Sequence, residues 1–395
     1  MNTLHPLAGH EKRRAAILRS FLAGRLPPTL LLHGPPGVGK QRLALWVGQL
    51  ILCEAPTADG PCNACRGCRM ALGLQHPDLV WYFPLERPRA RSSREKEEEA
   101  FEEARHAALD QVRSAPLRPS WSEQVRGIHF PMIRNLRKEA ARRPAAGPRR
   151  LFLIADAEEL VAQDSSAAAA NALLKTLEEP PADTWFILTS SEPGRILSTI
   201  RSRSTALHLA PLRADQVEAF LADHTDAEPE AIDKAVSLSG GSIGRALGFL
   251  PDGEADGPLD TIRRDAFRLL RAAIERRFAD RYALALAQKV SGGRGLHELL
   301  IALEGWIRDL AAIAAWPEAR VLNLDARSWL LDTVRTHAIH PDLAAASIEH
   351  VESARDAAAG NANPQLLIGN LLCQLHRALV GSTGSPREPK PLKTP

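Results

Sequence analysis

Short apolar runs alternate with amphipathic stretches between residues 10 and 209. The runs at 29–33, 78–83, 150–155, 184–189 and 205–209 predict buried parallel strands. Apolar positions at helical spacing predict helices at 10–24, 40–53, 133–141 and 164–177. The last of these begins with the capping sequence Asp164-Ser165-Ser166 and ends before Pro180. The alternation predicts an α/β fold with a doubly wound parallel sheet.

The pattern changes at three places along the chain. Residues 86–126 are rich in Arg, Glu, Pro and Ser, and the charged run at 94–99 has no apolar stripe, which predicts a solvated insertion with a helix at about 97–112. After residue 211 the strand signal ends, and two or three short helices fit within 213–250. A linker is predicted at 251–258, helices throughout 259–379, and a disordered tail at 381–395.

Composition narrows the class of protein. A chain of 395 residues predicts two or three domains, and 45% hydrophobic with 25% charged residues excludes wholesale disorder or a rod. A net charge of +3 is too small for a protein that coats nucleic acid. The apolar runs are too short to span a membrane, and the first residues lack the pattern of a secretory signal, so we expect a cytoplasmic protein.

A glycine-rich loop follows the first predicted strand. In Gly34-Pro-Pro-Gly37-Val-Gly39-Lys40, glycines allow backbone N–H groups to close around a phosphate, and the lysine adds a positive charge. The strand before the loop and the helix after it favour a phosphate-binding loop over a plain Gly/Pro-rich turn. Gln41 stands where Ser or Thr normally binds Mg²⁺, which places metal-assisted hydrolysis in doubt.

A second nucleotide element is expected at the end of a buried strand. Asp156 follows the run at 151–155 and is a candidate for indirect contact with the metal, although it could be merely a polar residue that ends the strand. Ala157 occupies the position of the glutamate that activates water, and Glu158 lies one residue too late. The changes at Gln41 and Ala157 both weaken the same reaction, the hydrolysis of a nucleotide.

Four of the five cysteines lie close together in the sequence, at Cys53, Cys62, Cys65 and Cys68. Their spacing suits a tetrahedral Cys₄ zinc site without an open position for catalysis. We therefore predict one structural zinc; reduced core thiols or an iron–sulfur site are the alternatives.

Three further strings are candidates for contacts with a nucleotide or a partner. The segment 171–181, NALLKTLEEPP, predicts an amphipathic helix with an acidic end. The run Arg201-Ser202-Arg203-Ser204 lies just before a strand, where an arginine could project across a subunit boundary toward a neighbour's phosphate, although a solvated surface arginine is the simpler interpretation. Arg245, in the first turns of a helix, could reach a bound nucleotide or could be plain surface charge.

The order of these strings resembles the AAA+ clamp-loader family of bacterial DNA polymerase III. The resemblance rests on the phosphate loop, the cysteine cluster, the Asp-ended strand, NALLKTLEEPP, Ser202-Arg203-Ser204 in place of Ser-Arg-Cys, and GSIGRAL at 241–247. The resemblance is strong at 29–250 and absent from the insertion at 86–126. After residue 250 it concerns only the expected helical architecture and not the sequence.

The resemblance implies a domain plan and a function. It implies an AAA+ domain at 1–211 with a zinc knuckle at 53–68, a helical lid at 212–252 and a helical collar at 258–380. It also implies a hetero-pentamer with delta and gamma/tau subunits that loads the sliding clamp onto primed DNA, as part of the DNA polymerase III holoenzyme. With its damaged nucleotide site, this chain would be the non-motor stator, without polymerase and without ATPase activity of its own, and Arg203 would act on a neighbour's ATP.

Two other functions stay open at this point. One is an ATP-hydrolysing motor of the gamma/tau type that holds ATP or ADP at Lys40, against which Gln41 and Ala157 argue. The other is a zinc-dependent DNA-binding protein outside any ring. The modest net charge argues against it, although one basic cluster could contact phosphates: Arg134, Arg137, Lys138, Arg142 and Arg143.

Overall fold

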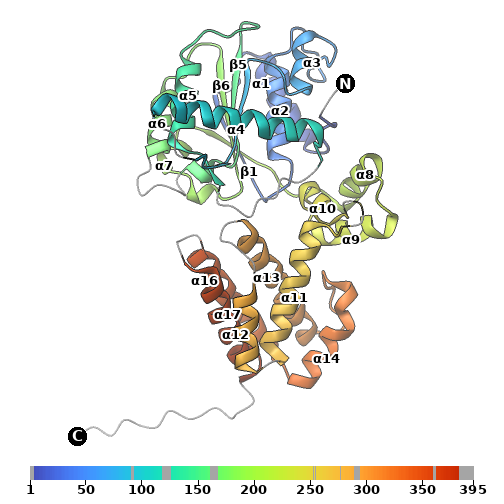
Figure 1. Ribbon diagram of the computed structural model, residues 1–395. Helices are drawn as coiled ribbons and strands as arrows, with labels where there is room; N and C mark the ends of the chain where they lie inside the picture. Colours follow the sequence, from blue (N-terminus) through green and yellow to red (C-terminus); the bar gives the residue numbers. More distant parts are fainter. Residues whose placement is uncertain are drawn as a thin grey trace, which may run out of the picture. The chain divides into compact units, whose positions relative to one another are not determined.

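The chain forms two compact units in the computed structural model, one ending at Ala255 and the other beginning at Asp256 (Figure 1). The structure describes residues 4–89, 93–117, 126–160, 168–251, 253, 255–275, 277–288, 294–358 and 362–381. The predicted cap at 164–166 and the predicted tail beyond residue 381 therefore lie outside the described residues.

A parallel five-stranded sheet organises the first unit, in the order β2-β5-β6-β1-β7. The central strands are almost wholly buried, as their continuous apolar runs predict, because helices cover both faces. The predicted doubly wound sheet is confirmed. Its strands are β1 (Thr29–His33), β2 (Leu79–Tyr82), β5 (Arg150–Ile154), β6 (Thr184–Ser190) and β7 (Thr205–His208).

The two faces of the sheet carry different helices. Side chains that alternate along β5 point to opposite faces: Leu151 packs with the helices of one side and Phe152 with those of the other. Phe152 stacks on Phe186 of β6, with ring centroids 5.3 Å apart. One face is covered by α1 (Glu11–Leu22) and α2 (Lys40–Ile51), the other by α5 (Phe130–Ala140) and α6 (Ala168–Glu178).

The described part of the insertion contains the predicted helix, but this helix packs against the sheet, which corrects the prediction of a solvated segment. It contains one long helix, α4 (Arg94–Ser114), in which Phe101 is 1% exposed and Leu109 is 6% exposed. Phe101 packs with the α5 side of the sheet and Leu109 with the α2 side, so α4 runs past the edge strand β2. The sequence prediction failed because the acidic run precedes the apolar positions, which begin only at Ala100.

Short elements that the sequence did not predict connect the larger ones. They are α3 (Arg66–Leu72), β3 (Leu85–Glu86), β4 (Arg126–Gly127), η1 (Ala157–Leu160), η2 (Pro193–Arg195) and α7 (Ser198–Arg201). The unit ends in three helices that share a small core of their own: α8 (Ala214–His224), α9 (Pro229–Ser239) and α10 (Ile243–Phe249).

In the described residues of the second unit the regular elements are all helices, as predicted, with a core centred on α13 and α17. Trp306 is 2% exposed, and its indole N–H donates to the carbonyl oxygen of Arg263 at 3.0 Å. None of the described helices is long and apolar enough to cross a membrane. The helices are α11 (Pro258–Glu275), α12 (Phe278–Ala287), α13 (Arg294–Ala315), α14 (Arg327–His337), α15 (Pro341–Ala346), α16 (Ile348–Ala358) and α17 (Pro364–Leu379), with η3 (Leu324–Ala326) before α14.

Candidate functional site

The glycine-rich loop joins β1 to α2, where a phosphate-binding loop belongs. Gly34, Gly37 and Gly39 all have positive φ, at 149°, 73° and 99°, in the region where L side chains are strained. A Cβ on Gly34 would lie 2.2 Å from the carbonyl oxygen of Leu209, and one on Gly37 would lie 2.4 Å from Ser242 Oγ. The loop therefore requires glycine both for its dihedral angles and for its close neighbours.

Lys40 is turned into the loop and is 5% exposed. Its ammonium donates to the carbonyl oxygens of Gly34 at 2.8 Å and Pro35 at 2.7 Å, and to Ser191 Oγ at 2.9 Å. Sequence reasoning missed Ser191. The signal that could have found it is its place just after β6, because β6 lies beside β1 in a parallel sheet and the carboxyl ends of such strands share one edge.

The beginning of α10 binds the other side of the loop. Ser242 Oγ donates to the carbonyl oxygen of Pro36 at 2.9 Å, and the Gly244 N–H donates to that of Gly37 at 3.0 Å. Arg245 lies in the first turn of this helix, where its backbone N–H donates to Ser242 Oγ; its contact with a nucleotide stays a prediction. Ser242 was not singled out in the sequence, since its contact spans about 200 residues of chain.

Gln41 and Asp156 face each other beside the loop. The amide nitrogen of Gln41 lies 3.4 Å from both carboxylate oxygens of Asp156, which has a left-handed backbone with φ 50°. Ala157 is fully buried and begins η1. The altered residue Gln41 thus faces the retained Asp156, at the point where a metal would lie in a nucleotide hydrolase.

Glu158 is directed toward the protein interior and is 6% exposed. One carboxylate oxygen accepts a hydrogen bond of 2.8 Å from the Ser191 N–H. Burial, together with the nearby Asp156 carboxylate, raises the pKa of Glu158. The sequence interpretation that Glu158 is poorly placed to act as the missing base agrees with this contact.

The four clustered cysteines converge on one point. Their sulfur atoms all lie within 4.8 Å of one another, with Cys62 and Cys68 separated by 3.9 Å and Cys53 and Cys65 by 4.0 Å. Four ligands about 2.3 Å from a tetrahedral zinc would have sulfurs about 3.8 Å apart, so the residues fit this metal. The predicted metal site is thus supported by geometry, and its closed Cys₄ set suits a structural ion.

Backbone N–H groups stabilise the thiolates of this cluster. Cys62, Cys65 and Cys68 each donate their N–H to the sulfur of the preceding cysteine in the set, at 3.3 Å. Hydrogen bonds from the backbone of Ala64 and Cys65 lower the pKa of Cys62 to about 6, whereas burial raises the pKa of Cys53 and Cys68. A bound cation would supply the charge that the two buried thiolates need.

Arg203 lies on an exposed turn between α7 and β7, beside the end of α6. Its guanidinium donates to the carbonyl oxygen of Thr199 at 2.8 Å and forms an ion pair with Glu178, the last residue of α6. The two side chains are 34% and 42% exposed and line a groove of about 530 Å³. The structure thereby joins two strings, 171–181 and 201–204, that the sequence analysis treated separately.

Comparison with known proteins agrees with this arrangement. A profile of the family described as "DNA polymerase III, delta subunit" matches residues 9–213, which is more than half of the chain. The chain belongs to this family. The match covers the loop, the cysteine cluster, Asp156 and Arg203, and ends before Arg245 and the second unit.

Individual relatives of the chain include both delta' and tau subunits of DNA polymerase III. The chain is 32% identical over 231 residues to DNA polymerase III subunit delta' of Escherichia coli, covering 58% of this chain and 57% of the relative. It is 35% identical over 215 residues to subunit delta' of Pseudomonas aeruginosa, covering 54% and 52%. Subunit tau of E. coli is 25% identical over 334 residues, covering 80% of this chain and 45% of that protein.

The chain thus spans about half the length of the curated relatives that it matches. The predicted resemblance to the clamp-loader family is confirmed, and the relatives that share 32% and 35% identity with the chain are delta' subunits.

Proposed function

We propose that this protein is the non-motor stator subunit of a DNA polymerase III clamp loader. In this role it assembles with delta and gamma/tau subunits into a hetero-pentamer and helps to load the sliding clamp onto primed DNA in the cytoplasm. The family match supports the clamp-loader assignment. The expected domain plan, with a lid at 212–252 and a collar at 258–380, belongs to the same proposal.

The observation that carries the non-motor part is the pairing of Gln41 with Asp156. An amide replaces the hydroxyl that would bind Mg²⁺, and Ala157 replaces the base that would activate water. Glu158 is engaged by the Ser191 N–H and is buried. The loop around Lys40 keeps the backbone of a phosphate site and can accept ATP or ADP, while the side chains for hydrolysis are missing.

Arg203 supports the second part, a contact with a neighbouring subunit's nucleotide. The ion pair between Arg203 and Glu178 is exposed on both sides, and pairs of this kind contribute roughly 0–1 kcal/mol. A nucleotide phosphate from a neighbour carries more charge than one carboxylate and can take its place. The guanidinium would then stabilise charge that develops on the neighbour's phosphate during hydrolysis.

ATP hydrolysis by the isolated protein tests the non-motor assignment. The wild-type protein and its Lys40→Ala variant should hydrolyse ATP at the same background rate, because both lack the hydroxyl that binds Mg²⁺ and the glutamate that activates water. A clear excess in the wild type would revive the alternative of a gamma/tau-type motor.

The reconstituted clamp loader tests the role of Arg203. Arg203→Ala should lower the DNA-stimulated ATPase of the complex while the subunits still co-elute in gel filtration. Arg201→Ala is the matched control, because Arg201 is also exposed and lies two residues away, where its guanidinium donates to the carbonyl oxygen of Pro193. Equal turnover in the two variants would contradict the proposed contact.

A further inference from the structure

A basic surface lies along α5 and the turn that follows it. A groove of about 410 Å³ between α5 and α6 has four cations and one carboxylate in its wall, Arg134, Arg137, Lys138 and Lys175 against Glu179. Arg142 and Arg143 are exposed just beyond the end of α5. This arrangement would suit a polyanion such as the phosphate backbone of DNA.

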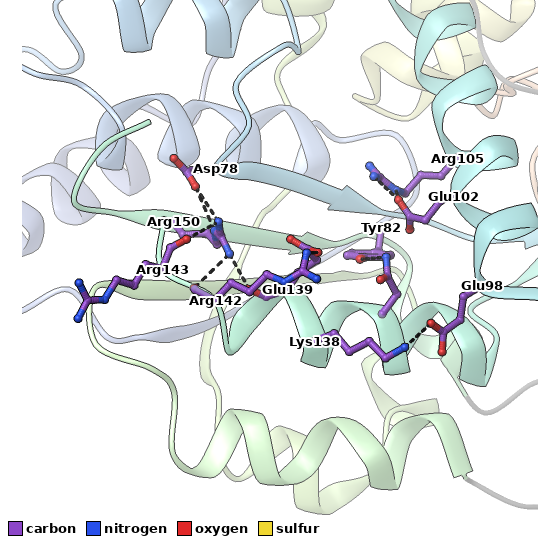
Figure 2. A network of polar contacts seen from close by, with 11 residues as sticks. Asp78, Tyr82, Glu98, Glu102, Arg105, Lys138, Glu139, Arg142, Arg143 and Arg150 are labelled. Atoms are coloured by element: carbon purple, nitrogen blue, oxygen red, sulfur yellow. Dashed lines mark hydrogen bonds and ion pairs between the residues drawn. The ribbon is translucent and has the colours of Figure 1, made fainter. Parts of the chain in front are cut away.

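One acidic side chain from α4 already occupies part of this surface. The carboxylate of Glu98 bridges two cations one helical turn apart: one oxygen accepts from Arg134 Nε, and the other from Lys138 Nζ at 2.6 Å. Figure 2 shows Glu98 reaching from α4 to Lys138 on the neighbouring helix. The exposed fractions of the three side chains are 11% for Glu98, 24% for Arg134 and 53% for Lys138.

Charge complementarity extends beyond this one residue. Positions 94–103 of α4 hold six glutamates against one arginine and one lysine, and this acidic half of the helix contains the contact with α5. Although burial opposes ionisation, hydrogen bonds from Lys138 and Arg134 hold the pKa of Glu98 below its usual value. Glu98 is therefore ionised at neutral pH, and its single negative charge offsets one of the two positive charges that it bridges.

We infer that Glu98 is an internal substitute for a phosphate group, which masks Arg134 and Lys138 until the phosphate backbone of DNA displaces it. Two oxygens of one carboxylate bind the two cations in the way that two oxygens of one phosphate would. Glu98 can leave while α4 stays in place, because the helix is anchored elsewhere by Phe101, which is buried against His129 with ring centroids 5.0 Å apart. The choice of DNA as the ligand rests on the proposed function.

Binding of a fluorescein-labelled primed duplex to the isolated full chain, measured by anisotropy between 50 and 200 mM NaCl, tests this inference. Glu98→Gln frees two cations, and each new phosphate contact steepens the dependence of log K on log salt by about 0.9. The affinity of the variant should therefore fall over this range by an additional factor of about 10 relative to wild type, and it should exceed the wild-type affinity at 50 mM.

Glu99→Gln is the matched control, because it removes the same charge from the next residue, which is exposed. It should leave the salt slope unchanged. Adding Arg134→Gln and Lys138→Gln to Glu98→Gln should return the slope to the wild-type value. Equal slopes for the Glu98 and Glu99 variants would overturn the inference and leave Glu98 with a structural role.

If Glu98→Gln fails to fold, Glu98→Asp serves instead, since it keeps the charge and shortens the side chain so that it cannot bridge both cations. An unchanged slope in that folded variant would equally overturn the inference. No clamp-loader partner is present in these experiments, so their failure is distinguishable from failure of the proposed assembly.

Discussion

The buried ion pair between Asp78 and Arg150 makes the sharpest prediction about stability. Asp78 is fully buried just before β2, and its carboxylate accepts from Arg150 Nε at 3.1 Å and from Nη2 at 3.0 Å. It also accepts from the N–H groups of Ala145 and Ala146, each at 2.7 Å. Asp78→Asn keeps the shape of the side chain and replaces one acceptor by an NH₂ group that faces these donors.

The expected loss follows from what remains after the substitution. Arg150 is 4% exposed, so its charge would stay buried without a counterion, and removal of one partner from such a pair costs about 3–5 kcal/mol. Asp110→Asn is the control: Asp110 is 71% exposed in its pair with Arg113, and its loss should cost less than about 1 kcal/mol.

Hydrogen exchange in a urea series measures both effects on the first unit alone. The protection of amides in β5 should be lost at a lower urea concentration in Asp78→Asn, and residues 141–149 should open first. Arg150 also donates to the carbonyl oxygens of Glu139, Arg142 and Arg143, so this one side chain closes the end of α5 (Figure 2). The urea concentration at which half of the β5 protection is lost should fall much further in Asp78→Asn than in Asp110→Asn. An equal shift in the two variants would show that the Asp78–Arg150 pair does not stabilise the sheet.

Two further predictions concern pH and metal. Burial raises the pKa of Glu159 to about 7, although the nearby charge of Arg195 acts in the opposite direction. Between about pH 4.5 and 7 the folded chain therefore keeps a proton that the unfolded chain releases, so the free energy of unfolding falls as the pH rises through this range. Glu159→Gln should therefore be more stable than wild type by about 3 kcal/mol at pH 8 and equal to it at pH 4, as measured by urea denaturation. An equal gain at both pH values would refute the pKa argument. Protein purified without added metal should contain about one zinc per chain by mass spectrometry. Cys62→Ser should lose this zinc, and Cys373→Ser, which lies outside the cluster, should keep it. Zinc retained by Cys62→Ser would place the metal elsewhere.

The sheet and the cysteine cluster were predictable because their signals lie in neighbouring residues of the sequence. An apolar run such as 151–154 indicates a buried strand without any information from the rest of the chain. The spacing of Cys62, Cys65 and Cys68 brings three sulfurs into one turn. The packing of α4 was not predictable, because its apolar stripe starts only after a charged run and contains just a few large side chains. A helix of this kind is indistinguishable from a solvated one until its partner surface is known.

The contacts around the candidate site were out of reach for a different reason. Ser191, Ser242 and Glu178 each bind a residue from a distant part of the chain, at Lys40, Pro36 and Arg203. Nothing in the residues next to them marks these partners. Knowledge of the strand order brings Ser191 to the loop, whereas the other two contacts depend on how helices pack, which the hydrophobic pattern alone does not determine.

Arg203, Arg134 and Lys138, which are proposed to contact other molecules, are each paired with a carboxylate of this chain. The two carboxylates, Glu178 and Glu98, differ in how exposed they are, and this difference determines which ligand can displace them. Arg203 and Glu178 are both more than a third exposed, so water already screens their attraction and exchange for a neighbour's phosphate costs little. Glu98 is 11% exposed and is shared by two cations, so its release needs a ligand that replaces both contacts together. A single anion can therefore compete at Arg203, whereas a polyanion that places phosphates along α5 is required to displace Glu98.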